Sequence, residues 1–183
     1  MQTEEKKERE RGERKLAARE ENLRYFQSFA LHMTVILFII WILMLKVIGF
    51  VTVRNADMYP RIDAGDLVMF YRLDKDPSAQ DVIVFKKNDT VYVGRVMAKE
   101  GDTVEITNSG SVKVNGNSLS ESGIYYETFP YEGYTEYPLT LEGGSCFVMM
   151  DMRNGGEDSR YFGPVTKNEI MGTAVMLVRR NNM

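Results

Sequence analysis

Cysteine and histidine are almost absent from this chain, and each absence excludes a class of chemistry. The 183 residues contain one cysteine, Cys146, and one histidine, His32. A single cysteine cannot form an internal disulfide, and Cys146 lies in an apolar run, so we expect it to be buried as a small apolar side chain. His32 lies in an apolar segment near the N-terminus. Histidine-based triads, Cys-His dyads and His-rich metal sites are therefore excluded from the rest of the chain.

The chain also lacks an excess of basic residues outside its first part. Residues 1–27 hold eight of the 23 Lys and Arg residues and seven of the 26 Asp and Glu residues. The remainder therefore carries 15 basic and 19 acidic side chains. Nucleic acid requires a basic surface, so we expect it not to be a partner.

One long apolar run interrupts the polar N-terminal part. From Phe29 to Phe50 the polar residues are His32, Thr34 and Lys46. At about 1.5 Å of rise per residue, a helix of this length spans roughly 33 Å, which is enough to cross the hydrocarbon core of a bilayer. We therefore predict a transmembrane helix over residues 29–50.

The flanks of this run indicate its orientation. A cleavable signal peptide has a shorter apolar core followed by a small-x-small site, and neither feature is present. Residues 1–28 form a charged tail that we expect to be helical, because Glu and Arg recur four residues apart. Its basic residues favour a cytoplasmic N-terminus. We expect a single-pass plasma-membrane protein with residues 51–183 outside the cell.

Beyond the apolar run the hydrophobic pattern changes to a period of two, which is typical of strands. Two turn signals, Asn108-Ser109-Gly110 and Asn115-Gly116, predict successive hairpins. No helical periodicity of useful length follows residue 54. We predict a mainly β protein, with one transmembrane helix and an all-β extracytoplasmic domain. The predicted strands cover residues 47–54, 66–72, 81–86, 91–98, 103–107, 111–114, 146–150 and 171–179.

Four short motifs lie in order behind the apolar run. They are Asp57-Met58-Tyr59-Pro60, Tyr92-Val93-Gly94-Arg95, Glu100-Gly101-Asp102, and Met150-Asp151-Met152-Arg153 leading to Asp158-Ser159-Arg160. In order and spacing the set resembles type I signal peptidases of the Gram-positive kind. Their boxes read Ser-Met-x-Pro, Lys-Arg, Pro-Gly-Asp and Gly-Asp-Asn-Arg-x-x-Ser-x-Asp-Ser-Arg. The resemblance implies the coiled, partly barrel-like β fold of that family.

Three positions depart from the family pattern. Asp57 stands where the family has its nucleophilic serine, and Gly94 stands where it has the lysine that accepts the proton. Gly156 stands where the family has a serine that supports the lysine. Nucleophile and base act as one unit, so losing either removes most of the rate acceleration. We therefore predict a signal-peptidase-like protein without catalytic residues, metal or cofactor.

Other motif residues match the family, and the resemblance implies their roles. Asn55 occupies the place of a donor to the oxyanion. A peptide groove is expected at Asn55, Asp57, Met58, Tyr59, Pro60 and Arg95. Structural roles are expected for Gly101 and Asp102, which permit a tight turn, and for Asp151, Arg153, Asp158, Ser159 and Arg160, with an Asp158–Arg160 ion pair.

An aromatic and acidic loop is predicted at about residues 120–142. Its rings either pack on the β core or contact a partner, because tyrosine provides contact area at a small entropic cost. The rings of this segment are Tyr125, Tyr126, Phe129, Tyr131, Tyr134 and Tyr137.

The sequence is similar to the degenerate signal peptidases linked to pilus assembly in Gram-positive bacteria, in which Asp and Gly also occupy the two dyad positions. The resemblance implies an accessory or chaperone role for sortase-built pili, with an exported protein such as a pilin, or the sortase, as partner. A divergent but active signal peptidase is the alternative. Asp57 sharing a proton with Asp151 or Asp158, metal binding at Asp57, and a vestigial protein without a partner are further readings. The sequence does not indicate the oligomeric state.

Overall fold

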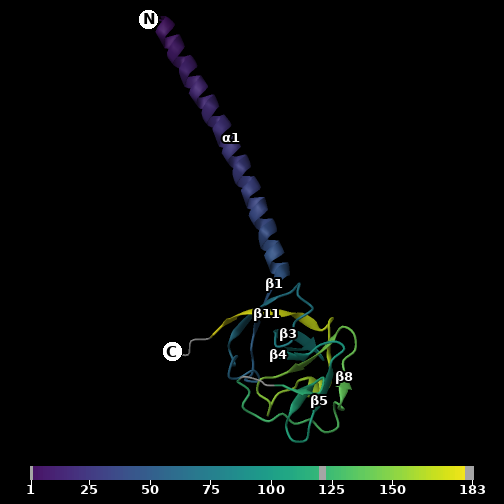
Figure 1. Cartoon of the computed structure of the whole chain (residues 1–183). Coiled ribbons are helices and arrows are strands. Elements are labelled where there is room, and N and C mark those ends of the chain that lie inside the picture. The colour runs from purple at the N-terminus through teal and green to yellow at the C-terminus, as the bar shows by residue number, and fades with distance from the viewer. Residues whose placement is uncertain (1, 120–122, 180–183) are drawn as a thin grey trace. The chain divides into compact units, whose positions relative to one another are not determined.

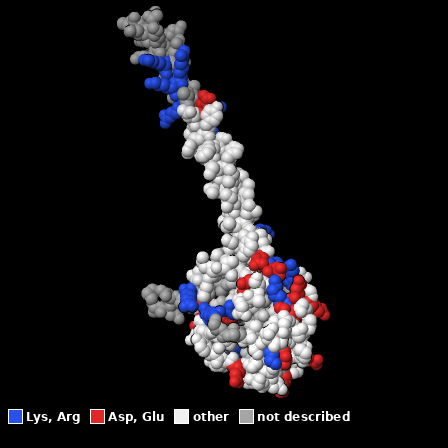
Figure 2. Space-filling view, in the orientation of Figure 1, with Lys and Arg blue, Asp and Glu red and all other residues white. Residues whose placement is uncertain are grey.

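The computed structural model describes residues 2–119 and 123–179, and the chain divides into two compact units, Met1–Leu45 and Lys46–Met183. The first unit is the helix α1, which runs from Gln2 to Val47 (Figure 1). Its part from Arg19 to Val47 is long and apolar enough to cross a membrane. The middle of α1 shows no charged atoms in Figure 2, while basic atoms gather toward its N-terminal end.

Two polar residues of the apolar run are satisfied within α1. Thr34 Oγ1 donates to the carbonyl of Ala30 at 2.8 Å, and His32 Nδ1 lies 2.6 Å from the carbonyl of Ser28. Such local bonds suit a helix without water around it. The helix ends at Val47, and the first strand begins at Ile48, so the predicted helix end at residue 50 was three residues too late.

The second unit is a mainly β domain, which confirms the predicted fold class. Each of the eight predicted strands has a counterpart in the structure. The strands are β1 (Ile48–Thr52), β2 (Leu67–Tyr71), β3 (Val82–Lys87), β4 (Thr90–Ala98), β5 (Thr103–Ile106), β6 (Val112–Val114), β7 (Asn117–Ser118), β8 (Leu139–Thr140), β9 (Ser145–Met149), β10 (Val165–Thr166) and β11 (Ile170–Val178).

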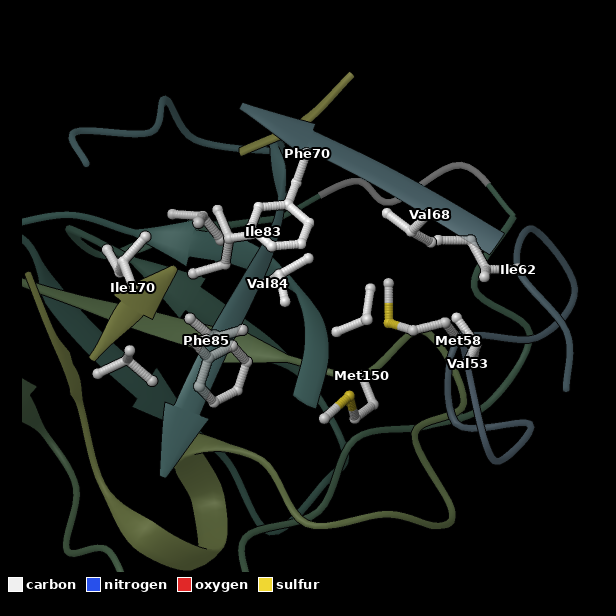
Figure 3. Packing of buried hydrophobic residues seen from close by; sticks show 14 of the residues in the cluster. Val53, Met58, Ile62, Val68, Phe70, Ile83, Val84, Phe85, Met150 and Ile170 are labelled. Atoms are coloured by element: carbon white, nitrogen blue, oxygen red, sulfur yellow. The ribbon is translucent and has the colours of Figure 1, made fainter. Parts of the chain in front are cut away.

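Seven strands form one antiparallel sheet in the order β1-β2-β11-β3-β4-β9-β10. Side chains of these strands and of neighbouring loops form the larger of two buried clusters, in which Phe70, Ile83 and Phe85 are almost fully enclosed. Figure 3 shows Val53 and Met58 at one side of this cluster. The turn that carries Asp57 is therefore anchored in the core by its neighbour Met58.

The other four strands form a small antiparallel sheet in the order β7-β6-β5-β8. β5 and β8 lie together at one side of the domain in Figure 1. The predicted hairpins are present: Gly110, Asn115 and Gly116 have φ values of 82°, 52° and 78°, the left-handed region that such turns require. A second buried cluster, which includes Val104 and Phe147, joins this sheet to the end of the large one.

The structure adds elements that the sequence pattern did not predict. β7, β8 and β10 have two residues each, and β8 lies within the segment expected to be a loop. A single helical turn, α2, covers Ser159–Phe162, and its four residues are too few to show a helical period. The Asp158 side chain accepts a hydrogen bond from the Arg160 amide and caps this turn.

Candidate functional site

The turn that carries Asp57 leads out of β1 and is fixed at both ends. The amide of Val53 donates to the carbonyl of Asp66 at 2.9 Å, and the amide of Met152 donates to the carbonyl of Asp57 at 2.8 Å. Met58 is 1% exposed. The first motif and the last motif, far apart in sequence, are thus bonded to each other through their main chains.

Asp57 and Gly156 lie against each other. A Cβ at Gly156 would be 2.8 Å from Asp57 Cγ and 3.0 Å from Oδ2. Gly156 also has φ of 79°, which glycine adopts without a steric cost. The space that a serine at position 156 would need is therefore occupied by the Asp57 carboxylate.

The Asp57 carboxylate is surrounded by other negatively charged side chains. Asn55 Nδ2 donates to Asp57 Oδ2 at 2.5 Å, so the amide expected as an oxyanion donor is directed at the carboxylate instead. Partial burial raises the pKa of Asp57, and the nearby charges of Asp158 and Glu157 raise it further. Because the carboxylate is crowded by other negative charges, the site favours a positive or hydrogen-bond-donating group.

Gly94, in β4, is closed over by core side chains. A Cβ at this position would lie 2.6 Å from Val148 Cγ1 and 3.3 Å from Phe85 Cε1. Val148 reaches this place from β9, where it pairs with Val96 of β4. The position at which the resemblance expects a lysine therefore has no room for even the first carbon of a side chain.

A cleft of about 530 Å³ opens beside Asp57. Two backbone stretches form most of it: residues 50–55, which include the end of β1, and residues 89–93, which include the start of β4. β1 pairs with β2 on one side. The start of β4 pairs with β3, and the pairing of β4 with β9 on its other side begins only at Arg95. Each stretch thus has one edge without a strand partner among the described residues. An extended peptide can add to such an edge through main-chain hydrogen bonds.

The cleft contains only some of the predicted groove residues. Asn55, Asp57 and Met58 line it, whereas Tyr59 and Pro60 do not. Arg95 does not line it either, which corrects its assignment to the groove. Arg95 is 8% exposed, and its Nε and Nη2 atoms donate to the two carboxylate oxygens of Asp151 at 2.8 and 2.7 Å. It is a bracing residue.

A second buried ion pair braces the last motif. Arg160 Nη2 lies 2.8 Å from Asp158 Oδ2, and the two side chains are 1% and 0% exposed. Burial alone would lower the pKa of Arg160, but the Asp158 carboxylate more than offsets this, and the pKa is raised. Ser159 accepts a hydrogen bond from the Val148 amide at 2.9 Å, and Arg153 Nε donates to the Met150 carbonyl at 2.8 Å.

The third motif forms a turn away from the cleft. Gly101 has φ of 83°, and Asp102 Oδ2 accepts a hydrogen bond from the Lys99 amide at 2.9 Å. Asp102 Oδ1 accepts another from Asn115 Nδ2 at 2.7 Å. This turn connects β4 to the small sheet.

The aromatic segment divides between packed and exposed rings. Tyr137 packs edge-on against Phe147, with ring centroids 6.2 Å apart. Tyr131 is half-buried, and its hydroxyl donates to the Gly156 carbonyl at 3.2 Å. The other four rings, which belong to Tyr125, Tyr126, Phe129 and Tyr134, are exposed by 46–78%. The packing reading is therefore confirmed for Tyr131 and Tyr137, and contact of the exposed rings with a partner stays a prediction.

Sequence reasoning missed two residues that shape the site. Glu157 accepts a hydrogen bond from the Tyr92 hydroxyl at 2.7 Å and, through its charge, helps to raise the pKa of Asp57. Its place next to Asp158 in the last motif could have identified it as a residue of the site. Val148 fills the space at Gly94 but lies in an ordinary apolar run, which carries no such signal.

The described residues that line the cleft include no serine, lysine or histidine. Asp151 and Asp158 each bind an arginine, so neither is available to share a proton with Asp57. Within residues 2–119 and 123–179, no group of three or more His, Cys, Asp or Glu side chains is arranged to hold a metal ion. What the cleft offers is two carboxylates, a guanidinium, an amide and three hydroxyls, together with main-chain edges and apolar walls.

A family model described as "Signal peptidase, peptidase S26" matches residues 26–179. The chain belongs to the signal peptidase family. This match includes all four motifs and also the apolar part of α1, so the predicted family resemblance is confirmed at this level.

Signal peptidase relatives differ in what their names state. A protein named Signal peptidase I from Bacillus caldolyticus is 33% identical over 136 residues, which cover 66% of this chain and 73% of the relative. One named Inactive signal peptidase IA from Staphylococcus aureus is 24% identical over 157 residues, 82% of this chain and 87% of the relative. Thylakoidal processing peptidase 1 from Arabidopsis thaliana is 29% identical over 140 residues, 68% of this chain, and the match spans only 40% of that relative.

Proposed function

We propose that this protein is a non-catalytic, membrane-anchored member of the signal peptidase family that holds an extended segment of an exported protein. It acts as an accessory or chaperone factor in the assembly of sortase-built pili. The partner is a pilin or the sortase. In this proposal the N-terminus lies in the cytoplasm and the β domain outside the cell.

The observation that carries the proposal is the state of the three positions that would perform peptide cleavage. Asp57 has no hydroxyl, and its carboxylate is bonded to Asn55. Gly94 is closed over by Val148, and Gly156 lies against Asp57. Hydrolysis by the family mechanism requires a hydroxyl and a neutral amine in contact. The hydroxyls of the cleft lining belong to Thr52, Thr90 and Tyr92, and the described residues of the lining include no lysine that could activate them.

The cleft still supports peptide binding. The edges of residues 50–55 and 89–93 supply main-chain donors and acceptors, and Val91 and Phe50 present apolar side chains that are 42% and 59% exposed. Asp57 adds a negative charge. Such a site binds an extended chain, with main-chain bonds providing affinity and side-chain pockets providing selectivity. The relative named inactive is consistent with a family member that lacks cleavage. The link to pili rests on the sequence resemblance.

A cleavage assay tests the absence of catalysis. Purified full-length protein in detergent or lipid is offered preproteins and pilin precursors, with an active signal peptidase as positive control. We expect no cleavage. Reproducible cleavage that is lost in Asp57→Ala would overturn the proposal in favour of a divergent signal peptidase, the reading suggested by the names of relatives such as the Bacillus caldolyticus protein.

Crosslinking tests the proposed occupant of the cleft. A photoreactive residue at position 57 in live cells is expected to trap a pilin or the sortase. Val91→Trp, which fills the cleft with a larger ring, is expected to abolish this crosslink. Tyr71→Trp, a similar change at an exposed position that does not line the cleft, serves as the matched control. An unchanged crosslink in Val91→Trp would contradict binding in the cleft.

A further inference from the structure

A second hollow, separate from the cleft, lies over the last motif. It has a volume of about 370 Å³ and contains exposed aromatic rings. Its residues are Tyr125, Tyr126, Glu127, Phe129, Tyr131, Arg153, Asn154 and Arg160. We call this surface the aromatic hollow.

Three of the four rings of the aromatic hollow are exposed. Tyr125 is 78% exposed, Tyr126 49% and Phe129 46%. Tyr131, by contrast, is held in place between Arg160, whose guanidinium lies 4.4 Å from the ring centroid, and the Gly156 carbonyl. A fixed ring beside a group of exposed rings is typical of a contact surface, because rings bring area and lose little side-chain entropy.

The two arginines at the base of the hollow are already engaged. Arg160 donates to Asp158, to the Arg153 carbonyl and to the Phe129 carbonyl, and it is 1% exposed. Arg153 donates to the Met150 carbonyl and to Thr128 Oγ1, and it is also 1% exposed. Neither guanidinium therefore presents donors to a ligand in the hollow.

The charge that an incoming ligand meets is negative. Glu127 lines the hollow and is exposed, and it forms no salt bridge within the described part of the chain. The Asp57 carboxylate lines the cleft and not the hollow, but its negative charge acts on Tyr131. Aromatic faces and carboxylates together attract ammonium and guanidinium groups, whereas they repel phosphates and other anions.

We propose that the aromatic hollow binds a lysine- or arginine-bearing segment of a polypeptide, with the cationic side chain against the exposed rings and near Glu127. The hollow contacts such a segment independently of the cleft. Its occupant is a protein segment of positive charge, selected by rings and a carboxylate.

A defined peptide tests this assignment. Full-length protein in detergent micelles is titrated into a short fluorescein-labelled peptide of alternating alanine, serine and lysine, and fluorescence anisotropy is measured. We expect Tyr125→Leu/Tyr126→Leu to weaken binding about 5- to 10-fold and Glu127→Gln about 2- to 5-fold. Tyr71→Leu and Glu142→Gln, which change an exposed tyrosine and an exposed carboxylate outside the hollow, are expected to leave the affinity unchanged.

The same peptide with acetylated lysines tests how much of the affinity comes from the positive charge of the lysine side chains. We expect its affinity to fall about 10-fold and the Glu127→Gln effect to disappear. Equal binding of the acetylated peptide, or equal binding by the Tyr125→Leu/Tyr126→Leu protein, would overturn the assignment. Near-UV circular dichroism of each variant verifies that the domain is folded, so a loss of binding is not a loss of structure.

Other occupants give different results. If the tyrosine variant instead abolishes self-association in sedimentation at high protein concentration, or binding to zwitterionic vesicles, without changing peptide affinity, the cationic-peptide assignment is wrong. The cleft variant Val91→Trp separates this inference from the proposed function. We expect it to retain binding of the lysine peptide, and its loss of lysine-peptide binding would place the peptide in the cleft instead.

Discussion

The bracing ion pairs and the cleft that they support differ in how far their polar groups are buried. Arg95 with Asp151 and Arg160 with Asp158 are almost fully enclosed, and each arginine is held by both carboxylate oxygens. Asp57 is partly exposed and crowded by negative charges. Removing one partner of a buried pair leaves an uncompensated charge, whereas losing a catalytic group at a surface costs the fold little. A member of this family can therefore lose its catalytic groups without losing the stability of the fold.

Breaking a bracing pair has the largest expected effect. In Arg160→Met the Asp158 carboxylate remains 0% exposed without its cation, and we expect a loss of about 3–5 kcal/mol in the free energy of unfolding. The measurement is guanidinium unfolding of the full chain in detergent, followed by near-UV circular dichroism of the tyrosines. Tryptophan fluorescence is unsuitable, because the single tryptophan, Trp41, lies in α1.

The exposed pair between Lys86 and Asp89 is the control for this change. Their side chains are 51% and 96% exposed, so Lys86→Met is expected to cause no measurable loss. Equal effects of Arg160→Met and Lys86→Met would show that the bracing pair does not stabilise the domain.

Filling the space at Gly94 has the next largest effect. Gly94→Ala forces a carbon to within 2.6 Å of Val148 Cγ1, and we expect a loss of about 1–3 kcal/mol in the free energy of unfolding. The double variant Gly94→Ala/Val148→Ala should lose less than the sum of the single changes, because the second change removes the clash. Gly143→Ala, where nothing lies within 4 Å of the added carbon, is the control and should be close to neutral. Additive effects would mean that Val148 does not close the position.

The Asp57 charge has the smallest effect, and it depends on pH. The folded-state pKa of Asp57 is raised, so the folded protein binds the proton more strongly than the unfolded chain. Stability therefore falls as pH rises from the unfolded pKa through the folded pKa. Asp57→Asn removes this penalty and should raise the Tm at neutral pH, with the gain vanishing below the unfolded pKa.

Thermal unfolding at a series of pH values measures the Asp57 effect. Glu142→Gln, which removes an exposed carboxylate outside the cleft, should show no comparable gain. A Tm for Asp57→Asn equal to that of the unaltered protein at every pH would mean that the carboxylate is not penalised in the folded state.

Most of the β domain could be predicted from alternation and turns. The strands from Val82 to Lys87 and from Thr90 to Ala98 are long and apolar, and Asn115-Gly116 at the hairpin has the expected left-handed backbone. The elements that escaped prediction have two to four residues, such as α2 at Ser159–Phe162. Elements of this length have too few residues to show a period.

The site was predictable in its residue types and not in its contacts. Motif spacing singled out Asp57, Gly94 and Gly156, and the roles that the family pattern gives to these positions stay a prediction. Arg95 was expected in the groove but binds the Asp151 carboxylate through two donors, and motif spacing does not show such a contact between distant segments. The predicted burial of Cys146 is confirmed, because this residue is 4% exposed, and burial raises the pKa of its thiol to about 12.

The order of residues alone determined the apolar helix and the β class, because these are matters of composition and local period. From the family resemblance it also predicts that a hydroxyl and an amine are missing from two motif positions. Tertiary structure decided that Val148 fills the space beside Gly94 and that Asp57 fills the space beside Gly156. It also decided which tyrosines pack and which remain exposed. Those outcomes depend on which segments, far apart in the sequence, contact each other, and a local sequence pattern does not show such contacts.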